Sequence, residues 1–377
     1  MIRGARKKVF VAMSGGVDSS VATLLLKKQG CDVVGVFMRC FNVDGCAERD
    51  AEDARRVAEK LEIPFYVFDF EEEYKRRVVD YMISGYRAGI TPNPDVMCNK
   101  EIKFGLFLEK ALELGADFIA TGHYVKLATS DKRQEARNGN ASSRVAGRLS
   151  LYSARDSAKD QSYFLWALTQ EQLRHCLFPI GDYLKSEVRE IARKAGLPTA
   201  EKKDSQGICF LGKITLDEFL KQYIPEKPGA ALSISGQRLG EHQGAHFYTI
   251  GQRHIGRKYQ VASSKGKHET LPLYVADKDT EANTITLAEG DTNPALYKKE
   301  IELTDVNFIN QQPITDNEQQ VYARVRYRQP LAEAKLITSK LGSYELIFEQ
   351  PQKFVAPGQS AVFYNKDDEI FGGGIIA

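Results

Sequence analysis

The sequence predicts an α/β protein with a parallel sheet, followed by a small linking domain and a C-terminal antiparallel β-barrel. Strand and helix patterns alternate over the first two hundred residues. Such alternation favours a parallel sheet that is covered on both faces. Short alternating strands predominate beyond about residue 274, and the stretch between is rich in Gly, Gln and His. The predicted domains are therefore 1–212, 213–274 and 275–377.

Hydrophobic spacing places the elements of the first domain. Short apolar runs bounded by turn residues predict buried strands at Lys8–Ala12, Cys31–Met38, Pro64–Asp69 and Asp117–Thr121. Apolar residues at three- and four-residue steps predict helices at Ser19–Gln29, Ala47–Leu61 and Lys103–Leu114. The polar stretch Thr129–Arg148 has no periodic apolar face, so we expect a mobile loop there.

The C-terminal region carries evenly spaced short strands, which predict a small antiparallel barrel. We expect them at Val321–Gln329, Ala334–Thr338, Tyr344–Phe348, Ala361–Tyr364 and Ile370–Ala377. In the first of these, Arg324, Arg326 and Arg328 share one face with Tyr322. Arginines beside an aromatic ring suit a phosphate backbone and stacked bases. A solvated strand face is the simpler interpretation, and the pattern alone favours it.

Composition excludes several classes of protein. The 377 residues contain 52 Lys plus Arg and 50 Asp plus Glu, so the formal charge of +2 argues against nucleic-acid binding over the whole surface. With 42% hydrophobic residues the chain is not disordered throughout. No apolar run is long enough for a membrane span, and Val9–Met13 is too short for a signal peptide. We therefore expect a cytoplasmic protein whose six cysteines are not disulfide staples.

The strongest motif, SGGVDSS, lies between the first strand and the first helix, at residues 14–20. Glycines let the backbone approach a ligand, and the serine hydroxyls and helix N-terminal amides suit a phosphate or pyrophosphate. Asp18 could help to hold Mg²⁺ on such phosphates. A plain glycine-rich turn is disfavoured because the motif is contiguous.

Two cysteines stand in unusual surroundings. In the segment TPNPDVMCNK, two prolines place Asp95 and Cys98 just before a helix expected near Glu101, where a nearby lysine and the helix end lower a thiol pKa. An incidental buried cysteine is the alternative. Cys209 lies in a polar, glycine-containing loop, which makes reactivity plausible.

The other potential ligands give weaker signals. The remaining cysteines and the histidines show neither C-x-x-C nor a zinc-protease pattern, so no metal site is expected. His123 follows a predicted strand end at the ligand-binding edge of the sheet, although a surface histidine is equally compatible.

Taken together, the chain resembles the tRNA-specific 2-thiouridylases of the N-type ATP pyrophosphatase (PP-loop) superfamily. The resemblance runs almost end to end, through SGGVDSS, TPNPDVMCNKEIKF, ADFIATGHY, KDQSYFL, KKDSQGICF, TIGQR, VRYRQ and PGQSAVFYN. The loop motif alone is also found in synthetases that make asparagine, GMP, argininosuccinate and NAD, which lack the paired cysteines. The chain departs from the family after Met38, where Arg39–Asn42 replaces an aromatic and acidic stretch, and in the longer loop Thr129–Arg148.

This resemblance implies ATP-dependent 2-thiolation of the wobble uridine of Glu, Lys and Gln tRNAs, with adenylation of the carbon-2 oxygen and release of AMP and pyrophosphate. It implies Cys98, Cys209 and Asp95 as catalytic residues. The implied ATP site consists of Ala12, Met13, Ser14, Gly15, Gly16, Val17, Asp18, Ser19, Met38 and Gly122. The implied contacts with the target base and the rest of the tRNA are Asn93, Pro94, Asp95, His123, Lys159, Asp160, Gln161, Arg326, Tyr327 and Gln359.

Several points stay open at this level. A persulfide on Cys209 attacks carbon 2 directly, or Cys98 first releases hydrosulfide from it. The expected cofactor is ATP with Mg²⁺; an iron–sulfur cluster on Cys98, Cys209 and Asp95 is less favoured because the ligand set is thin. A different PP-loop pyrophosphatase and an RNA-binding protein with a non-catalytic nucleotide site are the alternative functions. The expected partners are tRNA and a sulfur donor protein (a cysteine desulfurase or a sulfur-relay protein), and the chain is expected to be a monomer.

Overall fold

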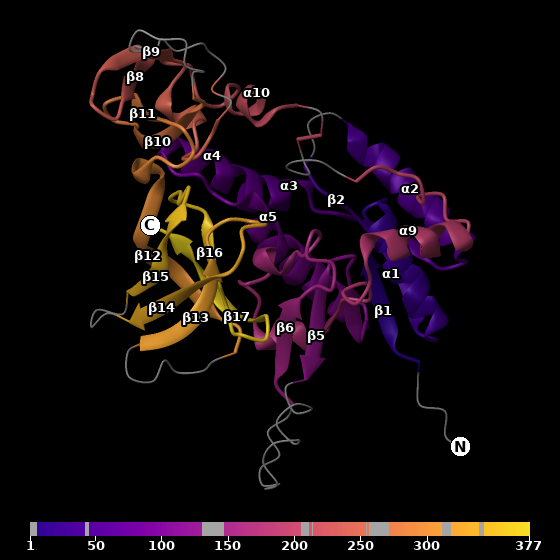
Figure 1. Cartoon of the computed structure of the whole chain (residues 1–377). Coiled ribbons are helices and arrows are strands. Elements are labelled where there is room, and N and C mark those ends of the chain that lie inside the picture. Colours follow the sequence, from indigo (N-terminus) through magenta and orange to yellow (C-terminus); the bar gives the residue numbers. More distant parts are fainter. Residues whose placement is uncertain are drawn as a thin grey trace, which may run out of the picture.

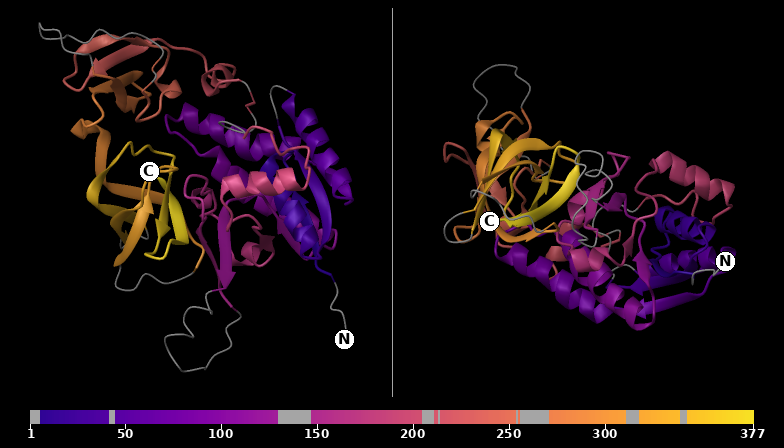
Figure 2. Two further views of the ribbon diagram at one scale, coloured as in Figure 1. Left: turned by 45° about the vertical axis from the view of Figure 1, so that its right-hand side comes forward. Right: turned by 90° about the horizontal axis from the view of Figure 1, so that it is seen from below.

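The computed structural model has three parts arranged as the sequence predicts (Figure 1). An α/β domain holds a parallel sheet, a small middle domain follows it, and an antiparallel barrel ends the chain. The residues that the structure describes are 6–41, 45–129, 147–204, 211–212, 214–253, 255, 271–310, 318–338 and 343–377. Figure 2 shows the barrel beside the α/β domain, with the middle domain at the end away from the β5–β6 hairpin.

The parallel sheet has the strand order β3-β2-β1-β4-β7. Its strands are β1 (Lys8–Ala12), β2 (Asp32–Arg39), β3 (Phe65–Asp69), β4 (Phe118–Ala120) and β7 (Cys176–Leu177). The chain builds outward from β1 to β3 on one side, and β4 then pairs on the other side of β1. The carboxyl ends of β1 and β4 therefore form the switch point where ligands bind in such sheets.

Helices pack on the sheet and connect its strands. The first two, α1 (Val17–Lys28) and α2 (Cys46–Lys60), lie where the sequence predicts them. A longer helical stretch was not predicted: α3 (Glu71–Tyr74), the π-helical η1 (Lys75–Val79) and α4 (Asp80–Arg87). Its buried side chains Tyr74, Val78, Met82 and Tyr86 recur every four residues, so the periodic signal was present in the sequence.

The helix after the proline-rich segment begins earlier than predicted. It comprises α5 (Pro94–Met97), the π-helical η2 (Cys98–Leu106) and α6 (Phe107–Glu113), whereas the sequence pattern suggested a start near Glu101 or Lys103. The Asn93 side chain accepts a hydrogen bond from the Val96 amide at 3.3 Å, and Pro94 occupies the first helical position. Both features favour a helix start, which the apolar spacing alone does not reveal.

The rest of the α/β domain completes the wall around the switch point. It contains the hairpin strands β5 (Val125–Thr129) and β6 (Leu149–Ser153), and the helices η3 (Ser162–Phe164), α8 (Gln170–Leu173) and α9 (Lys185–Lys194). Most of the loop predicted between residues 129 and 148 lies outside the described residues, but its two ends pair as an antiparallel hairpin.

The middle domain is a four-stranded sheet of order β10-β11-β8-β9, preceded by α10 (Leu216–Leu220). Its strands are β8 (Gly229–Ser233), β9 (Arg238–His242), β10 (Leu273–Asp279) and β11 (Thr284–Glu289), with η4 at Ala245–Phe247. The predicted boundary at residue 274 falls inside β10. Because β11 pairs with β8, both late strands belong to this sheet rather than to the barrel.

The C-terminal sheet closes into a barrel because β12 pairs with both β15 and β17. After η5 (Pro294–Leu296), its strands are β12 (Tyr297–Phe308), β13 (Glu318–Arg324), β14 (Ala332–Thr338), β15 (Tyr344–Lys353), β16 (Ser360–Tyr364) and β17 (Glu369–Ile376). The hairpin from the α/β domain joins this sheet, with Leu151 opposite Ile370. The strand predicted over 321–329 ends at Arg324, and Arg328 has φ +64° in the following turn.

The domains share buried apolar surface. One core cluster contains Phe107 of the α/β domain, Tyr248 of the middle domain and Val362 of the barrel. Among the described residues, no helix has both the length and the apolar character needed to cross a membrane.

Candidate active site

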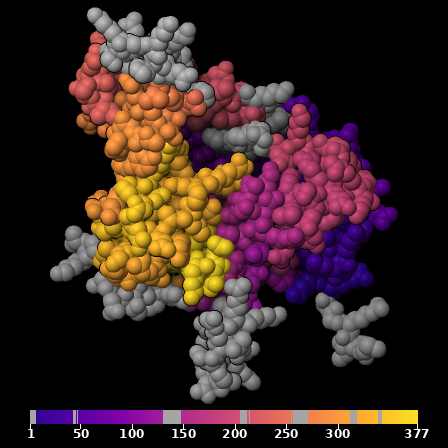
Figure 3. Space-filling view, in the orientation of Figure 1, coloured from indigo at the N-terminus to yellow at the C-terminus, as the bar shows by residue number. Residues whose placement is uncertain are grey.

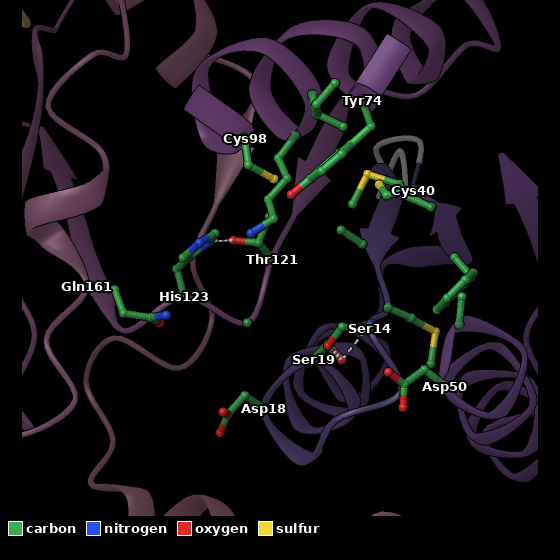
Figure 4. A pocket seen from close by; sticks show the side chains of 18 of the residues that line it. Ser14, Asp18, Ser19, Cys40, Asp50, Tyr74, Cys98, Thr121, His123 and Gln161 are labelled. Atoms are coloured by element: carbon green, nitrogen blue, oxygen red, sulfur yellow. Dashed lines mark hydrogen bonds between the residues drawn. The ribbon is translucent and has the colours of Figure 1, made fainter. Parts of the chain in front are cut away.

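The turn from β1 to α1 leaves bare backbone at the switch point. Gly15 has φ +70°, and a Cβ atom there would lie 2.3 Å from the Asp50 carbonyl oxygen. A Cβ on Gly122, just after β4, would lie 2.6 Å from the Ser19 amide nitrogen. Ser14 Oγ and Ser19 Oγ are 3.3 Å apart at the start of α1 (Figure 4). The two glycines thus let the turn pack directly against neighbouring backbone, and the turn then offers backbone amides and serine hydroxyls, groups that suit phosphate oxygens.

A cavity of about 310 Å³ opens from this turn. Its predicted lining residues are Ala12, Met13, Ser14, Asp18, Ser19, Met38 and Gly122. Largely apolar side chains that the sequence did not single out also line it: Phe37, Cys40, Phe41, Ala47 and Tyr74. Polar groups for phosphates together with apolar surface for a base suit a nucleotide.

A second cavity of about 620 Å³ adjoins the first and extends from the turn to the barrel. Gly16 and Val17 line it on one side, and Tyr327 and Arg328 on the other. Between them lie Asp95, Cys98, Lys103, His123, Lys159, Gln161 and Asp204. On the surface, a hollow is visible between the α/β domain and the middle domain (Figure 3), whereas the residues that line this cavity come from the α/β domain and the barrel. The structure thus brings the predicted nucleotide loop and two of the three predicted catalytic residues to one space.

Asp95 and Cys98 lie one helical turn apart, at the start of the helix that Asn93 caps. Burial raises the pKa of Asp95, and the positive charge of Lys103 opposes that rise. Cys98 follows the first helical turn and does not precede the helix as predicted. The positive end of the helix dipole therefore acts mainly on Asp95, which lies in the first turn. Asn93 and Pro94, two of the predicted base contacts, are themselves buried and form the turn that presents Asp95.

Cys209, the third predicted catalytic residue, lies outside the described residues. The last described residue before it, Asp204, lines the second cavity together with Lys202 and Lys203. Cys176 is buried, and burial raises the pKa of its thiol. A buried thiol with a raised pKa forms little thiolate and is a poor nucleophile.

His123 is buried between the rings of Phe104 and Phe178 and lines both cavities. Its Nδ1 lies 2.8 Å from Thr121 Oγ1 (Figure 4). Burial lowers the pKa of His123 well below its ordinary value, and the charge of Lys103 lowers it further. The imidazole is therefore neutral at physiological pH.

Asp18 is held by two polar groups from other elements. Tyr124 donates its hydroxyl to Asp18 Oδ1 at 2.8 Å, and Lys185 Nζ lies 2.8 Å from both carboxylate oxygens. Among the residues that the structure describes, no group of three or more His, Cys, Asp or Glu side chains could hold a metal ion. In this structure the positively charged group that pairs with the Asp18 carboxylate is Lys185.

The segment 159–161, predicted to contact tRNA, divides its side chains among different partners. Lys159 bonds Asp204 at 2.6 Å, and the Gln161 side chain accepts the Tyr124 amide at 3.0 Å. Asp160 is 4% exposed, and its carboxylate bonds Arg324 of the barrel at 2.6 Å. Lys159 and Gln161 reach the second cavity, whereas a contact between Asp160 and tRNA would require its buried pair to open.

The barrel residues correct part of the sequence interpretation. Arg324 is buried, so the prediction of one arginine face on this strand is wrong. Tyr327 packs on Phe164 with ring centroids 4.6 Å apart, and Arg326 lies over the Phe354 ring. Gln359 donates its side-chain amide to the Thr91 carbonyl at 2.9 Å, so it holds the backbone two residues before Asn93.

Comparisons with known proteins decide the family. The model described as "tRNA methyl transferase HUP domain" matches residues 7–213, more than half of the chain. The "tRNA methyl transferase PRC-barrel domain" matches 217–289, and the "Aminomethyltransferase beta-barrel domain" matches 298–376. A relative from Streptococcus thermophilus, described as "tRNA-specific 2-thiouridylase MnmA", is 42% identical over 100% of this chain and 96% of its own length.

The chain belongs to the tRNA-specific 2-thiouridylase family. A Bacillus licheniformis protein of the same description is 44% identical over 98% of this chain and 94% of its own length. One from Alkaliphilus oremlandii is 43% identical over 95% of this chain and 94% of its own length. The resemblance inferred from the motifs is confirmed, and with it the enzyme class of a tRNA-uridine 2-sulfurtransferase.

The structure adds residues to the 2-thiouridylase site that the motifs did not identify. Lys103 lines both cavities, while Lys202, Asp204 and Arg328 line the second. Lys103 lies five residues after Cys98 in a helix of π-type, whose backbone hydrogen bonds join residues five positions apart, and the sequence gave no sign of that helix type. Arg328, which the alternating pattern had placed on a strand face, instead reaches the cavity from the turn after β13.

Proposed function

We propose that this chain uses ATP to replace the carbon-2 oxygen of the wobble uridine in Glu, Lys and Gln tRNAs with sulfur. The observation that supports this most directly is the pair of adjoining cavities that joins the nucleotide loop to Asp95, Cys98 and the barrel side chain Tyr327. A nucleotide, a flipped base and a thiol can share that space. An enzyme that acts on a base must take it out of its stack, and a cavity that opens between domains accommodates such a base.

In the first proposed step, the uridine O2 attacks the α-phosphorus of ATP. A P–O bond forms, the bond to the β-phosphate bridging oxygen breaks, and pyrophosphate leaves toward Ser14 and the α1 amides. The uridine N3 loses its proton to Asp95, and burial, which raises the pKa of this carboxyl group, makes it a stronger base than an exposed aspartate. Gly15 and Gly122 allow the close backbone packing of the turn that carries the Ser14 and Ser19 hydroxyls, which suit the phosphates. Mg²⁺ carried on ATP would be held by its phosphates and by Asp18, and would neutralise phosphate charge.

In the second proposed step, the terminal sulfur of a Cys209 persulfide attacks carbon 2, and AMP leaves with the original oxygen. The Cys98 thiolate then attacks the Cys209 sulfur, which gives a Cys98–Cys209 disulfide and 2-thiouridine, while Asp95 returns the proton to N3. In the alternative order, Cys98 attacks first and releases hydrosulfide, which then attacks carbon 2. A thiol reductant returns the disulfide to two thiols. The role of Cys209 rests on its family motif, KKDSQGICF.

No step requires an iron–sulfur cluster. The cluster would use Cys98, Cys209 and Asp95, and the described part of this set offers one thiol and one carboxyl group. The expected partner that loads Cys209 is a persulfide-carrying protein, such as a cysteine desulfurase or a sulfur-relay protein. A nearly balanced net charge fits a monomer that holds tRNA through local basic groups, with salt-sensitive affinity.

Mass spectrometry of nucleosides tests the proposal. A tRNA transcript for Glu, Lys or Gln is incubated with the protein, ATP and a protein persulfide donor, and we expect 2-thiouridine together with AMP and pyrophosphate. Full activity of Cys209→Ser with that donor would show that the role of Cys209 is wrong. Pyrophosphate release that needs no tRNA would instead favour a pyrophosphatase acting on a small substrate.

A further inference from the structure

An ion-pair hub lies where the chain enters the segment that carries Cys209. Asp204 bonds three cations: Lys159 at 2.6 Å, Lys185 at 2.8 Å and Arg189 at 2.9 Å. Lys159 lies shortly before η3, while Lys185 and Arg189 are on the first two turns of α9. The next residues, 205–210, contain Cys209, five positions after Asp204. One carboxylate thus fixes this point of the chain to two separate elements.

The hub is connected to the nucleotide loop. Lys185 bridges Asp204 to Asp18, with 2.8 Å to each carboxylate, and its side chain is 12% exposed. Arg189 also donates to the carbonyl oxygens of Ala200 and Lys202 at 3.0 Å, so it holds the backbone that leads to Asp204. A sheltered pair of this kind is screened by salt much less than an exposed pair.

Asp204 stays negatively charged, so its ion pairs persist over the working pH range. Burial disfavours its charged form, but the hydrogen bonds from Lys159 and Lys185 prevail and lower the pKa of Asp204 to about 2. The carboxylate is therefore ionised at every pH at which the protein would work. It faces the cavity that also contains Cys98 and Asp95, and the sequence motifs gave it no role.

We propose that Asp204 is a positioning residue for the sulfur-transfer step, which sets the start of the Cys209 segment relative to the nucleotide loop through Lys185. This inference rests on the proposed function. The bonds that hold Asp18 come from Tyr124 and Lys185, so Asp18 should keep them when Asp204 is neutralised. Adenylation should therefore survive the loss of Asp204, while transfer from Cys209 should not, because a misplacement of about 1 Å can cost about a hundredfold in rate.

The test separates the two steps in the full-length protein. Adenylation is followed as tRNA-dependent AMP and pyrophosphate formation, and sulfur transfer as 2-thiouridine made in a single turnover of persulfide-loaded enzyme. For Asp204→Asn we expect adenylation within about threefold of the unmodified protein and sulfur transfer lowered about tenfold or more. Asp204→Glu should recover part of the transfer rate. Lys185→Met should slow both steps, because it also removes the cation from Asp18.

Free sulfide supplies the discriminating measurement, because it needs no Cys209. Asp204→Asn given ATP and sulfide should make 2-thiouridine at nearly the rate of the unmodified protein, which a general structural defect would not allow. Arg193→Met is the matched control: it removes an exposed ion pair of α9, with Glu201 at 2.6 Å, and should change neither step.

Equal loss of both steps in Asp204→Asn, or an unchanged transfer rate, would overturn the inference. Should that variant fail to fold, Arg189→Met removes one of the three partners of Asp204 without changing a residue that lines either cavity, and it must show the same split. Failure of the unmodified protein to form AMP with tRNA would overturn the proposed function instead, so the two failures are distinguishable.

Discussion

At the scale of single residues, Gly15 determines whether the nucleotide turn can form. Its φ of +70° lies in the left-handed region, and its missing Cβ leaves room for the Asp50 carbonyl oxygen. An L side chain there meets a conformational penalty of about 1–2 kcal/mol and a steric clash as well. Glycine is thus required at this position for two reasons, the left-handed backbone and the close contact with Asp50. Only the first reason could be expected from the sequence.

Gly15→Ala should therefore weaken ATP binding about tenfold or more, because the backbone must move away from Asp50 and take the phosphate-binding amides with it. Calorimetric titration of ATP measures this effect. Gly30→Ala is the control: Gly30 has φ +83° but no atom within 4 Å of a Cβ, so it should cost stability and leave ATP affinity unchanged. Equal effects of the two variants on affinity would contradict the steric explanation.

The buried His123 should make the folding stability of the protein depend on pH. Its pKa is lowered in the folded protein, so below about pH 6.5 the unfolded chain binds a proton that the folded protein does not. Folding stability should then fall as the pH drops below about 6.5, by at most about 1.4 kcal/mol per pH unit from this group. Urea unfolding at pH 7.5 and 5.5 measures this loss. His123→Gln should reduce the loss, and an identical pH dependence in both proteins would contradict it.

At the scale of elements, the start of the helix at Pro94 determines where the reactive groups face. The Asn93 cap and Pro94 begin the helix before Asp95, which places Asp95 in its first turn and Cys98 just after it. The capping residues were visible in the sequence, but the apolar spacing pointed to a later start. Local capping thus outweighed the hydrophobic pattern in setting this boundary.

Asn93→Ala should remove the bond to the Val96 amide and destabilise the protein by about 1 kcal/mol. It should also lower the thiolation rate, since Asp95 and Cys98 depend on this helix start. Thr215→Ala removes a comparable cap from α10. The Thr215 hydroxyl accepts the Glu218 amide at 3.2 Å, and neither residue lines either cavity. Thermal unfolding and thiolation assays of both variants distinguish the two; thiolation lost equally in each would argue against a special role for the Asn93 cap.

At the scale of the whole molecule, a buried ion pair joins the barrel to the α/β domain. Arg324 donates to Asp160 at 2.6 Å and to the Tyr364 hydroxyl at 2.7 Å, and both charged side chains are less than 10% exposed. Asp160 adjoins Lys159 and Gln161, which reach the second cavity. Docking of the barrel therefore helps to place cavity residues that belong to a different domain.

Arg324→Met should destabilise the protein by about 3–5 kcal/mol, because it leaves the Asp160 carboxylate buried without its partner. Adding Asp160→Asn should recover part of that loss, since the neutral amide has no charge to bury. Lys335→Met, which breaks the exposed pair with Glu318 at 2.6 Å, should cost no more than about 1 kcal/mol. Denaturant unfolding measures all three, and a double variant no more stable than Arg324→Met would contradict the explanation.

The sequence by itself determined the three-part fold class, several strands and helices of the first domain, the nucleotide loop and the family, because each of these rests on local spacing or contiguous motifs. It also identified Asp95, Cys98 and Tyr327, which the structure brings to one cavity. Only the tertiary structure decided that β10 and β11 complete the middle sheet, that Arg324 faces Asp160, and that Asp204 meets three cations. These depend on pairings between residues as far as 164 positions apart, and no local pattern specifies which distant partner will fill a buried site.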